Sequence, residues 1–264
     1  MTEPRIWDGA ADLPMVVGRR PRPEIVALAA DTLPTVAELF TFMRDAELRF
    51  GTLRMQIEER NFGVAGELLT IVDVALRHPG DARVTTTQPA LGTSANHEIW
   101  ITDGETVRTY SAPHRLGTER PVRRGVVGIS GPESRSLPPA SRVYTPLTTL
   151  PMETLPETFV HPAGYCQNVL STGVCRIVGL GDVGDRETIV FECDHPRTIE
   201  LSADRPDFRI RIAVDRADGV ILRLEESIGG AVTRDARVTG YEPDAPLPPT
   251  IFDFTFPPGT TMLF

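Results

Sequence analysis

Two places in the chain bring a thiol and an imidazole close together in sequence. Cys193-Asp194-His195 joins a thiol, a carboxylate and an imidazole, and His161 precedes Cys166 by five residues. A cysteine nucleophile needs a base within reach of its sulfur and a third group that orients the base. On a strand, Cys193 and His195 would point to one face and Asp194 to the other. We therefore expect structural side chains here and a protein that is not an enzyme. A hydrolase or thiol enzyme using Cys193 or Cys166 is the alternative.

Metal and cofactor chemistry has little support in the sequence. The five histidines (78, 97, 114, 161 and 195) are dispersed, and no two of the three cysteines have the two-residue spacing of zinc ligands. HExxH, GxSxG, phosphate-loop and GxGxxG motifs are all missing. All 27 cationic side chains are arginine, which excludes every lysine Schiff base. We predict no metal and no cofactor.

The charged residues suggest two further kinds of site. A formal net charge of −9 argues against nucleic acid as a partner, because phosphates need a basic face. Carboxylates flank a predicted hairpin, and we expect them to pair with arginines across strands. These are Asp215, Asp218, Glu225 and Glu226, with Arg209, Arg211, Arg216 and Arg223 as partners. Guanidinium groups at Arg115, Arg123 and Arg124 could bind an anionic head group, and a solvated loop is the alternative.

The N-terminal part of the chain predicts an arm and one helix. Residues 1–31 have no sustained periodicity, so we expect a poorly ordered or surface-wrapping arm. Thr35 and Glu38 have the spacing of a capping box, and apolar residues then follow at helical spacing to Met43. The predicted helix ends between Asp45 and Glu47. We find no signal-peptide core and no run of about 18 apolar residues, so we expect a cytoplasmic protein without a transmembrane segment. Export would require an N-terminal extension.

Most of the remaining chain alternates between apolar and polar residues, which is typical of half-buried strands. Predicted strands include 53–58, 67–77, 82–88 and a hairpin over 97–111 whose Asp103-Gly104 pair favours a type I′ turn. After an insertion at about 112–170, strands resume at Cys175 and continue as an antiparallel meander. We predict a mainly β (α+β) fold with about ten antiparallel strands. Residues 32–264 would form a single domain, an unclosed half-barrel with an N-terminal helix and a loop-and-helix lid at 112–170.

Four segments resemble the LolA-like superfamily of lipoprotein and lipid carriers when their order is considered together. They are AELRFGTLRMQIEE (46–59), WITDGETVRTY (100–110), AVDRADGVILRLE (213–225) and FDFTFPPGT (252–260), the last similar to a closing aromatic strand. The resemblance covers roughly residues 33–260. It implies an open half-barrel with a lid, and it extends to regulators of sigma factors that have the same fold.

Two binding functions follow from this resemblance. In the first, a non-enzymatic protein holds an acyl chain, a lipid or a lipidated partner in the concave face of the sheet. In the second, an edge strand or the proline-rich segment docks a protein partner, as in regulators that bind anti-sigma proteins. A filled core is the alternative for the apolar residues that would line the cavity. Those residues are Phe40, Met43, Leu53, Met55, Ile57, Leu69, Ile71, Ile210, Ile212, Leu222 and Leu224.

Overall fold

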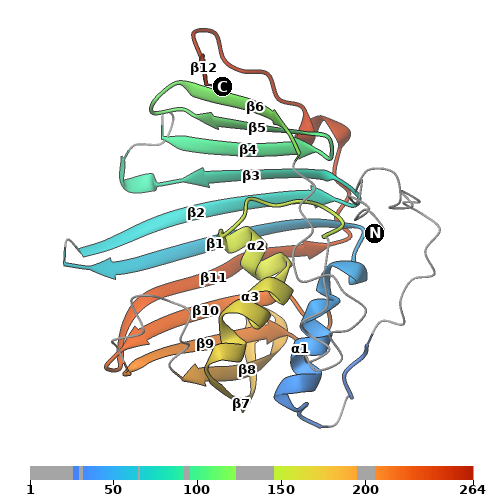
Figure 1. The fold of residues 1–264 in the computed structure, drawn as a ribbon, viewed down its shortest axis with the longest axis vertical. Helices are drawn as coiled ribbons and strands as arrows, with labels where there is room; N and C mark the ends of the chain where they lie inside the picture. The colour runs from blue at the N-terminus through green and yellow to red at the C-terminus, as the bar shows by residue number, and fades with distance from the viewer. Residues whose placement is uncertain are drawn as a thin grey trace, which may run out of the picture.

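A single sheet of 12 strands organises the computed structural model of this chain (Figure 1). The structure describes residues 26–29, 32–64, 66–91, 96–122, 146–194 and 206–263. The strand order is β12-β6-β5-β4-β3-β2-β1-β11-β10-β9-β8-β7, and every pairing is antiparallel except the parallel one between β12 and β6. The two edge strands, β12 and β7, do not pair, so the sheet is open, as the sequence predicted.

The strands follow one another along the sheet mostly in chain order, and β1 continues beyond its predicted range of 53–58. They are β1 (Thr52–Gly63), β2 (Gly66–Arg77), β3 (Asp81–Thr87), β4 (His97–Asp103), β5 (Thr106–Ser111), β6 (Leu116–Pro121), β7 (Val174–Val183), β8 (Arg186–Asp194), β9 (Phe208–Asp215), β10 (Ile221–Ile228), β11 (Ala231–Pro243) and β12 (Thr261–Leu263).

The first helix, α1 (Val36–Arg44), begins where the capping box predicts. The Thr35 hydroxyl accepts from the Glu38 amide at 3.3 Å, and the Glu38 carboxylate accepts from the Thr35 amide at 2.7 Å. Each contact satisfies an amide that has no partner within the helix. The helix ends at Arg44 with Asp45 as its C-cap, at the start of the predicted interval, and the 3-10 helix η1 (Ala46–Arg49) leads into β1.

Helices cover only part of one face of the sheet. This inner face carries Leu53, Met55 and Ile57 of β1, all essentially buried. On it lie α1 and the helical cover (155–172), which consists of α2 (Leu155–Val160), α3 (Pro162–Asn168) and η4 (Leu170–Thr172). Figure 1 shows these helices over β1 and β7–β11, with β3–β6 beside them. The main hydrophobic core therefore fills one half of the inner face.

The outer face carries a smaller cluster under the C-terminal segment. Ile99, Ile101 and Tyr110 are buried there, with Phe254 and Phe256 packed against them. The Phe254 ring lies 6.1 Å from the Tyr110 ring and 5.1 Å from the Phe256 ring, measured between centroids. After η5 (Pro249–Phe252), residues 253–256 run without strand pairing, so the predicted closing aromatic strand over 252–256 is wrong.

Within the described residues the sheet has 12 strands, against about ten predicted. Two other details of the prediction need correction. The predicted insertion at 112–170 begins with β6, which is an integral strand, and its middle (123–145) lies outside the described residues. At the β4–β5 hairpin only Gly104 has a positive φ (84°), so the Asp103-Gly104 pair does not form a type I′ turn. Of the predicted arm, the structure describes only residues 26–29, whose Leu28 packs against the main core.

No helix within the described parts of the chain has the length and apolarity needed to cross a bilayer.

Candidate ligand-binding site

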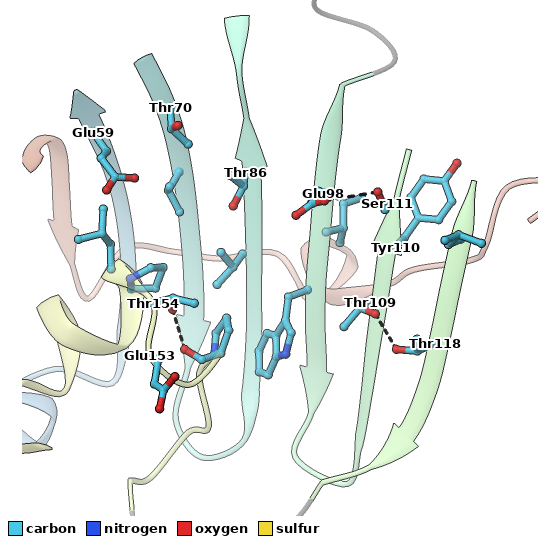
Figure 2. A pocket seen from close by; sticks show the side chains of 18 of the residues that line it. Glu59, Thr70, Thr86, Glu98, Thr109, Tyr110, Ser111, Thr118, Glu153 and Thr154 are labelled. Carbon is cyan, nitrogen blue, oxygen red and sulfur yellow. Dashed lines mark hydrogen bonds between the residues drawn. The ribbon is translucent and has the colours of Figure 1, made fainter. Parts of the chain in front are cut away.

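A pocket with a volume of about 620 Å³ lies on the inner face beside the helical cover (Figure 2). That volume falls in the range of roughly 300–1,000 Å³ that is usual for small-molecule sites. The pocket is lined by apolar and polar residues from β1–β6, β11, β12 and residues 151–156, and these include Ile99 and Tyr110 of the outer-face cluster. The lining residues are Glu59, Thr70, Val72, Val84, Thr86, Glu98, Ile99, Trp100, Thr109, Tyr110, Ser111, Leu116, Thr118, Pro151, Glu153, Thr154, Leu155, Pro156, Arg234 and Leu263.

The strand register explains how the floor of the pocket is built. Val74, Val84, Trp100, Thr109 and Thr118 are successive cross-strand neighbours from β2 to β6. Because alternate residues of a strand share a face, this row lies on the inner face throughout. Where the helices end, the row changes from core valines to the indole of Trp100 and then to threonines.

A second row lies one step further along the strands and is more polar. Val72, Thr86, Glu98, Ser111 and Leu116 are cross-strand neighbours from β2 to β6. The Ser111 hydroxyl donates to a Glu98 carboxylate oxygen at 3.4 Å. Figure 2 shows Thr86 and Glu98 at the same end of the strands as Glu59 and Thr70. The pocket is thus apolar inside and polar along this edge, which we call the polar rim (Glu59, Thr70, Thr86, Glu98 and Ser111).

On one side of the pocket Arg234 forms ion pairs with two carboxylates. The Arg234 Nε lies 2.7 Å from a Glu59 carboxylate oxygen, and its Nη1 lies 3.2 Å from a Glu226 oxygen. Burial alone would lower the pKa of Arg234, but the carboxylates of Glu226 and Glu59 raise it above its ordinary value. Arg234 is therefore a fixed positive charge that is already engaged by two carboxylates.

Another wall of the pocket comes from residues 151–156, which lead into the helical cover. Leu155 is buried, and Pro151 and Pro156 are its neighbours in the lining. The Thr154 hydroxyl donates to the Pro151 carbonyl at 2.6 Å, and the Glu153 amide donates to the Glu157 carboxylate at 2.5 Å. These local bonds fix the turn that presents Leu155 to the pocket.

The apolar residues that the sequence nominated for the lining lie elsewhere. Nine of them (Phe40, Met43, Leu53, Met55, Ile57, Ile210, Ile212, Leu222 and Leu224) are buried in the main core under the helices, and none lines the pocket. Leu69 and Ile71 are half-buried on the outer face, because Met55 pairs with Val74 and Ile57 with Val72. On the inner face β2 presents Val72, Val74 and Leu76 instead.

Of the predicted arginine site for an anionic head group, Arg115 is the residue that the structure describes, and it does not line the pocket. Arg115 is exposed, and its Nη2 donates to the Pro258 carbonyl at 2.9 Å. The backbone carbonyl of Arg115 accepts from the Thr261 amide at 2.8 Å, so this residue anchors the C-terminal segment. Arg123 and Arg124 lie outside the described residues.

The cysteines are structural in their surroundings. Cys166 is buried, its thiol contacts the Met43 sulfur at 3.8 Å, and burial raises the pKa of that thiol. Cys175 and Cys193 face each other across β7 and β8, and both thiols donate to the Leu170 carbonyl, at 3.2 and 3.4 Å. His195, the candidate base for Cys193, lies outside the described residues.

His161 has a different partner from the predicted Cys166. Its Nε2 lies 3.1 Å from a carboxylate oxygen of Glu47, and both side chains are almost fully buried. The same Glu47 oxygen accepts from the Leu147 amide at 3.0 Å. Nearby, His78 Nδ1 lies 2.7 Å from the Thr148 hydroxyl, and burial lowers the pKa of His78 to about 4. Nothing in the sequence pattern connected residues so far apart in the chain.

The predicted cross-strand ion pairs were mostly assigned to the wrong partners. The buried Asp215 carboxylate accepts hydrogen bonds from Nε and Nη2 of Arg186, at 2.7 and 2.9 Å, and Arg186 Nη2 also donates to Asp218 at 2.7 Å. Of the predicted ion pairs, the one between Arg223 and Glu225 is present, with a distance of 2.8 Å, and both residues lie on β10. The other three predicted arginines bind different carboxylates: Arg209 binds Asp194, Arg211 lies near Glu192 and Arg216 binds Glu187.

The pocket lining consists of apolar, hydroxyl and charged side chains. Within the described part of the chain it includes no histidine or cysteine. No group of three or more His, Cys, Asp or Glu side chains among the described residues could hold a metal ion. What the pocket offers is apolar contact area, hydroxyl groups and carboxylates.

Solved structures similar to this chain include a LolA superfamily protein. That protein, from Nitrosomonas europaea, has 11% identity and a TM-score of 0.31, over 84% of this chain and 99% of its own. The Pseudomonas aeruginosa MucA/MucB complex has 14% identity and a TM-score of 0.47, over 83% of this chain. This chain spans only 60% of that one. An uncharacterized conserved protein from Thermus thermophilus has 13% identity and a TM-score of 0.47, over 86% and 98% of the two chains. Neither a protein-family model nor a curated protein sequence matches the chain.

Proposed function

We propose that this protein is a non-enzymatic binding protein that holds an apolar or amphiphilic small molecule in the pocket on the inner face. The observation that carries the proposal is the pocket itself, with about 620 Å³ of space between apolar side chains and a polar rim. An alkyl chain packed against Val84, Trp100 and Leu155 would gain about 25 cal/mol for each Å² of apolar surface removed from water. No reactive group is needed for such binding.

Trp100 makes the proposal directly testable. The chain has two tryptophans, Trp7 and Trp100, and Trp100 lines the pocket. In a Trp7→Phe background, titration with a neutral dodecyl maltoside below its micelle concentration should change the Trp100 fluorescence in a saturable way. Native mass spectrometry of the gently purified protein would then look for a co-purifying molecule.

A matched pair of variants separates binding in the pocket from adsorption elsewhere. Thr86→Phe puts a ring into the pocket, whereas Thr87→Phe puts the same ring on the outer face, because the two residues are adjacent on β3. We expect Thr86→Phe to weaken binding at least tenfold and Thr87→Phe to leave it unchanged. Equal affinity in both variants, or no saturable signal in the parent protein, would contradict the proposal.

The edge strand β7 supports a second candidate function, the binding of a protein partner. Val174, Val178 and Leu180 are 73%, 48% and 52% exposed on this strand, which is one of the two edges of the sheet. An extended peptide can add a strand to such an edge through main-chain hydrogen bonds. A partner recovered with the parent protein and lost with Val178→Asp/Leu180→Asp would support this function. Equal recovery with both proteins would count against it.

A further inference from the structure

We infer that the pocket selects amphiphiles with a positively charged head group over those with an anionic one. This inference rests on the proposed binding of an amphiphile and adds the class of ligand. In the pocket, the polar rim is adjacent to an apolar interior. Glu98 lies two residues before Trp100 on β4, so both side chains are on the inner face and both line the pocket.

The charges of the lining favour a cation. Three carboxylates (Glu59, Glu98 and Glu153) line the pocket, against one cationic side chain, Arg234. Arg234 is already bound by Glu59 at 2.7 Å and by Glu226 at 3.2 Å, so its charge is compensated within the protein. A carboxylate, sulfate or phosphate head group would find no free cation among the described lining residues.

Glu98 is the carboxylate best placed to bind such a head group. Its contact among the described residues is the Ser111 hydroxyl at 3.4 Å, and no described cation forms an ion pair with it. Thr86 is its cross-strand neighbour on the other side, so hydroxyl groups flank the carboxylate in the same row. The Trp100 indole, one row further in, also lines the pocket, and an indole is an aromatic group that can attract cations. An ammonium or guanidinium head group at the polar rim would contact the Glu98 carboxylate and the flanking hydroxyl groups. The alkyl chain of the same ligand would lie in the apolar interior.

This arrangement differs from the arginine site that the sequence suggested. An arginine cluster would have bound anions, but Arg115 is held by the Pro258 carbonyl and is not part of the lining. Among the described lining residues, the acidic rim therefore favours a ligand of the opposite charge to the one that the arginines suggested. Because Glu98 is exposed, its attraction for a cation should weaken as salt increases.

Three amphiphiles with the same dodecyl chain test the inference in the Trp7→Phe background. Dodecyltrimethylammonium, dodecyl maltoside and dodecyl sulfate are titrated at low ionic strength and below their micelle concentrations, with Trp100 fluorescence as the signal. We expect the ammonium compound to bind most tightly and the sulfate most weakly, with at least a tenfold difference between them. Tenfold corresponds to ~1.4 kcal/mol.

Two variants separate the rim from the overall negative charge. Glu98→Gln should reduce the preference for ammonium over sulfate several-fold, whereas Glu105→Gln, at an exposed position outside the lining, should leave it unchanged. If the sulfate binds as tightly as the ammonium compound, or if both variants behave alike, the inference is wrong while the proposed binding function stands. If none of the three compounds binds, both fail.

Discussion

Protonation of His78 should destabilise the folded protein between pH 7 and pH 4. Burial lowers the pKa of His78 to about 4 from its ordinary value of 6.5, although the nearby Glu47 carboxylate opposes this effect and His161 adds to it. The ring is stacked on Phe50 with the centroids 5.5 Å apart, and its Nδ1 lies 2.7 Å from the Thr148 hydroxyl. Its buried Nε2 has no hydrogen-bond partner among the described residues, so a second proton would have no acceptor.

The sign and size of the effect follow from linkage. The pKa is lower in the folded state, so the unfolded chain binds the proton more readily and the free energy of unfolding falls as pH decreases. The loss begins near pH 6.5 and is complete near pH 4, the two pKa values of this group. Between these limits it totals about 3 kcal/mol, of which about 2 kcal/mol is lost between pH 7 and pH 5.

Urea denaturation at fixed ionic strength across this pH range would measure the effect. His78→Asn keeps a polar atom near the Thr148 hydroxyl but cannot be protonated, so its stability should fall by about 2 kcal/mol less between pH 7 and pH 5. Its stability at pH 7 should be lower than that of the parent protein, because the stacking on Phe50 is lost. His114→Asn, at an exposed position, is the control and should keep the slope of the parent. If His78→Asn also keeps that slope, the assigned cause is wrong.

Three substitutions test contacts that stabilise the sheet and helix α1. Gly117→Ala would place a Cβ atom 2.6 Å from the Phe256 ring, and we expect about 1–3 kcal/mol of destabilisation by overpacking, measured by thermal unfolding. Asp215→Ala leaves the Arg186 guanidinium without its main partner and should cost about 3 kcal/mol in denaturant, and a cost under about 1 kcal/mol would contradict that role. Thr35→Ala removes the hydroxyl that caps α1 and should cost about 1 kcal/mol, whereas Thr35→Ser should restore most of it.

Asp182→Ala provides the matched control for the buried carboxylate. Asp182 is exposed on β7, so its removal should change the free energy of unfolding by less than about 0.5 kcal/mol. An equal cost at both positions would show that net charge, and not the Arg186 contact, determines the effect of Asp215→Ala.

Local signals in the sequence predicted the elements whose causes are local. The spacing of Thr35 and Glu38 is sufficient to place the start of α1, since both capping contacts lie within one turn. Consecutive glycines favour a turn, and Gly229 and Gly230 both have positive φ, 59° and 82°, as a type I′ hairpin turn requires. Ile210 and Ile212 alternate with Arg209 and Arg211, and in β9 the isoleucines are buried while the arginines are exposed.

The predictions that failed concern features that depend on which residues become neighbours in the folded chain. β2 has apolar residues on both faces, so its pattern alone could not show whether Ile71 or Val72 faces the core. Only the pairing of Met55 with Val74 determines this. Phe254 and Phe256 are spaced as on a strand, but the prolines that follow them cannot donate to a ladder and the segment packs on the outer face. The pocket was missed because its lining comes from many strands, and each strand contributes only a few residues of ordinary type.

The division of the inner face into a covered and an uncovered half should separate stability from binding. Met55 lies under the helices and is 1% exposed, so Met55→Ala should lower the free energy of unfolding by about 2–5 kcal/mol. Met55 does not line the pocket, so the affinity of folded Met55→Ala protein for dodecyl maltoside should stay within about twofold of the parent value. Thr86→Phe should do the reverse, with a tenfold or greater loss of affinity and less than about 1 kcal/mol of destabilisation, because the pocket has room for the ring. If Met55→Ala abolishes binding in the folded protein, the core and the pocket are mechanically coupled, and the helical cover must then be treated as part of the binding site.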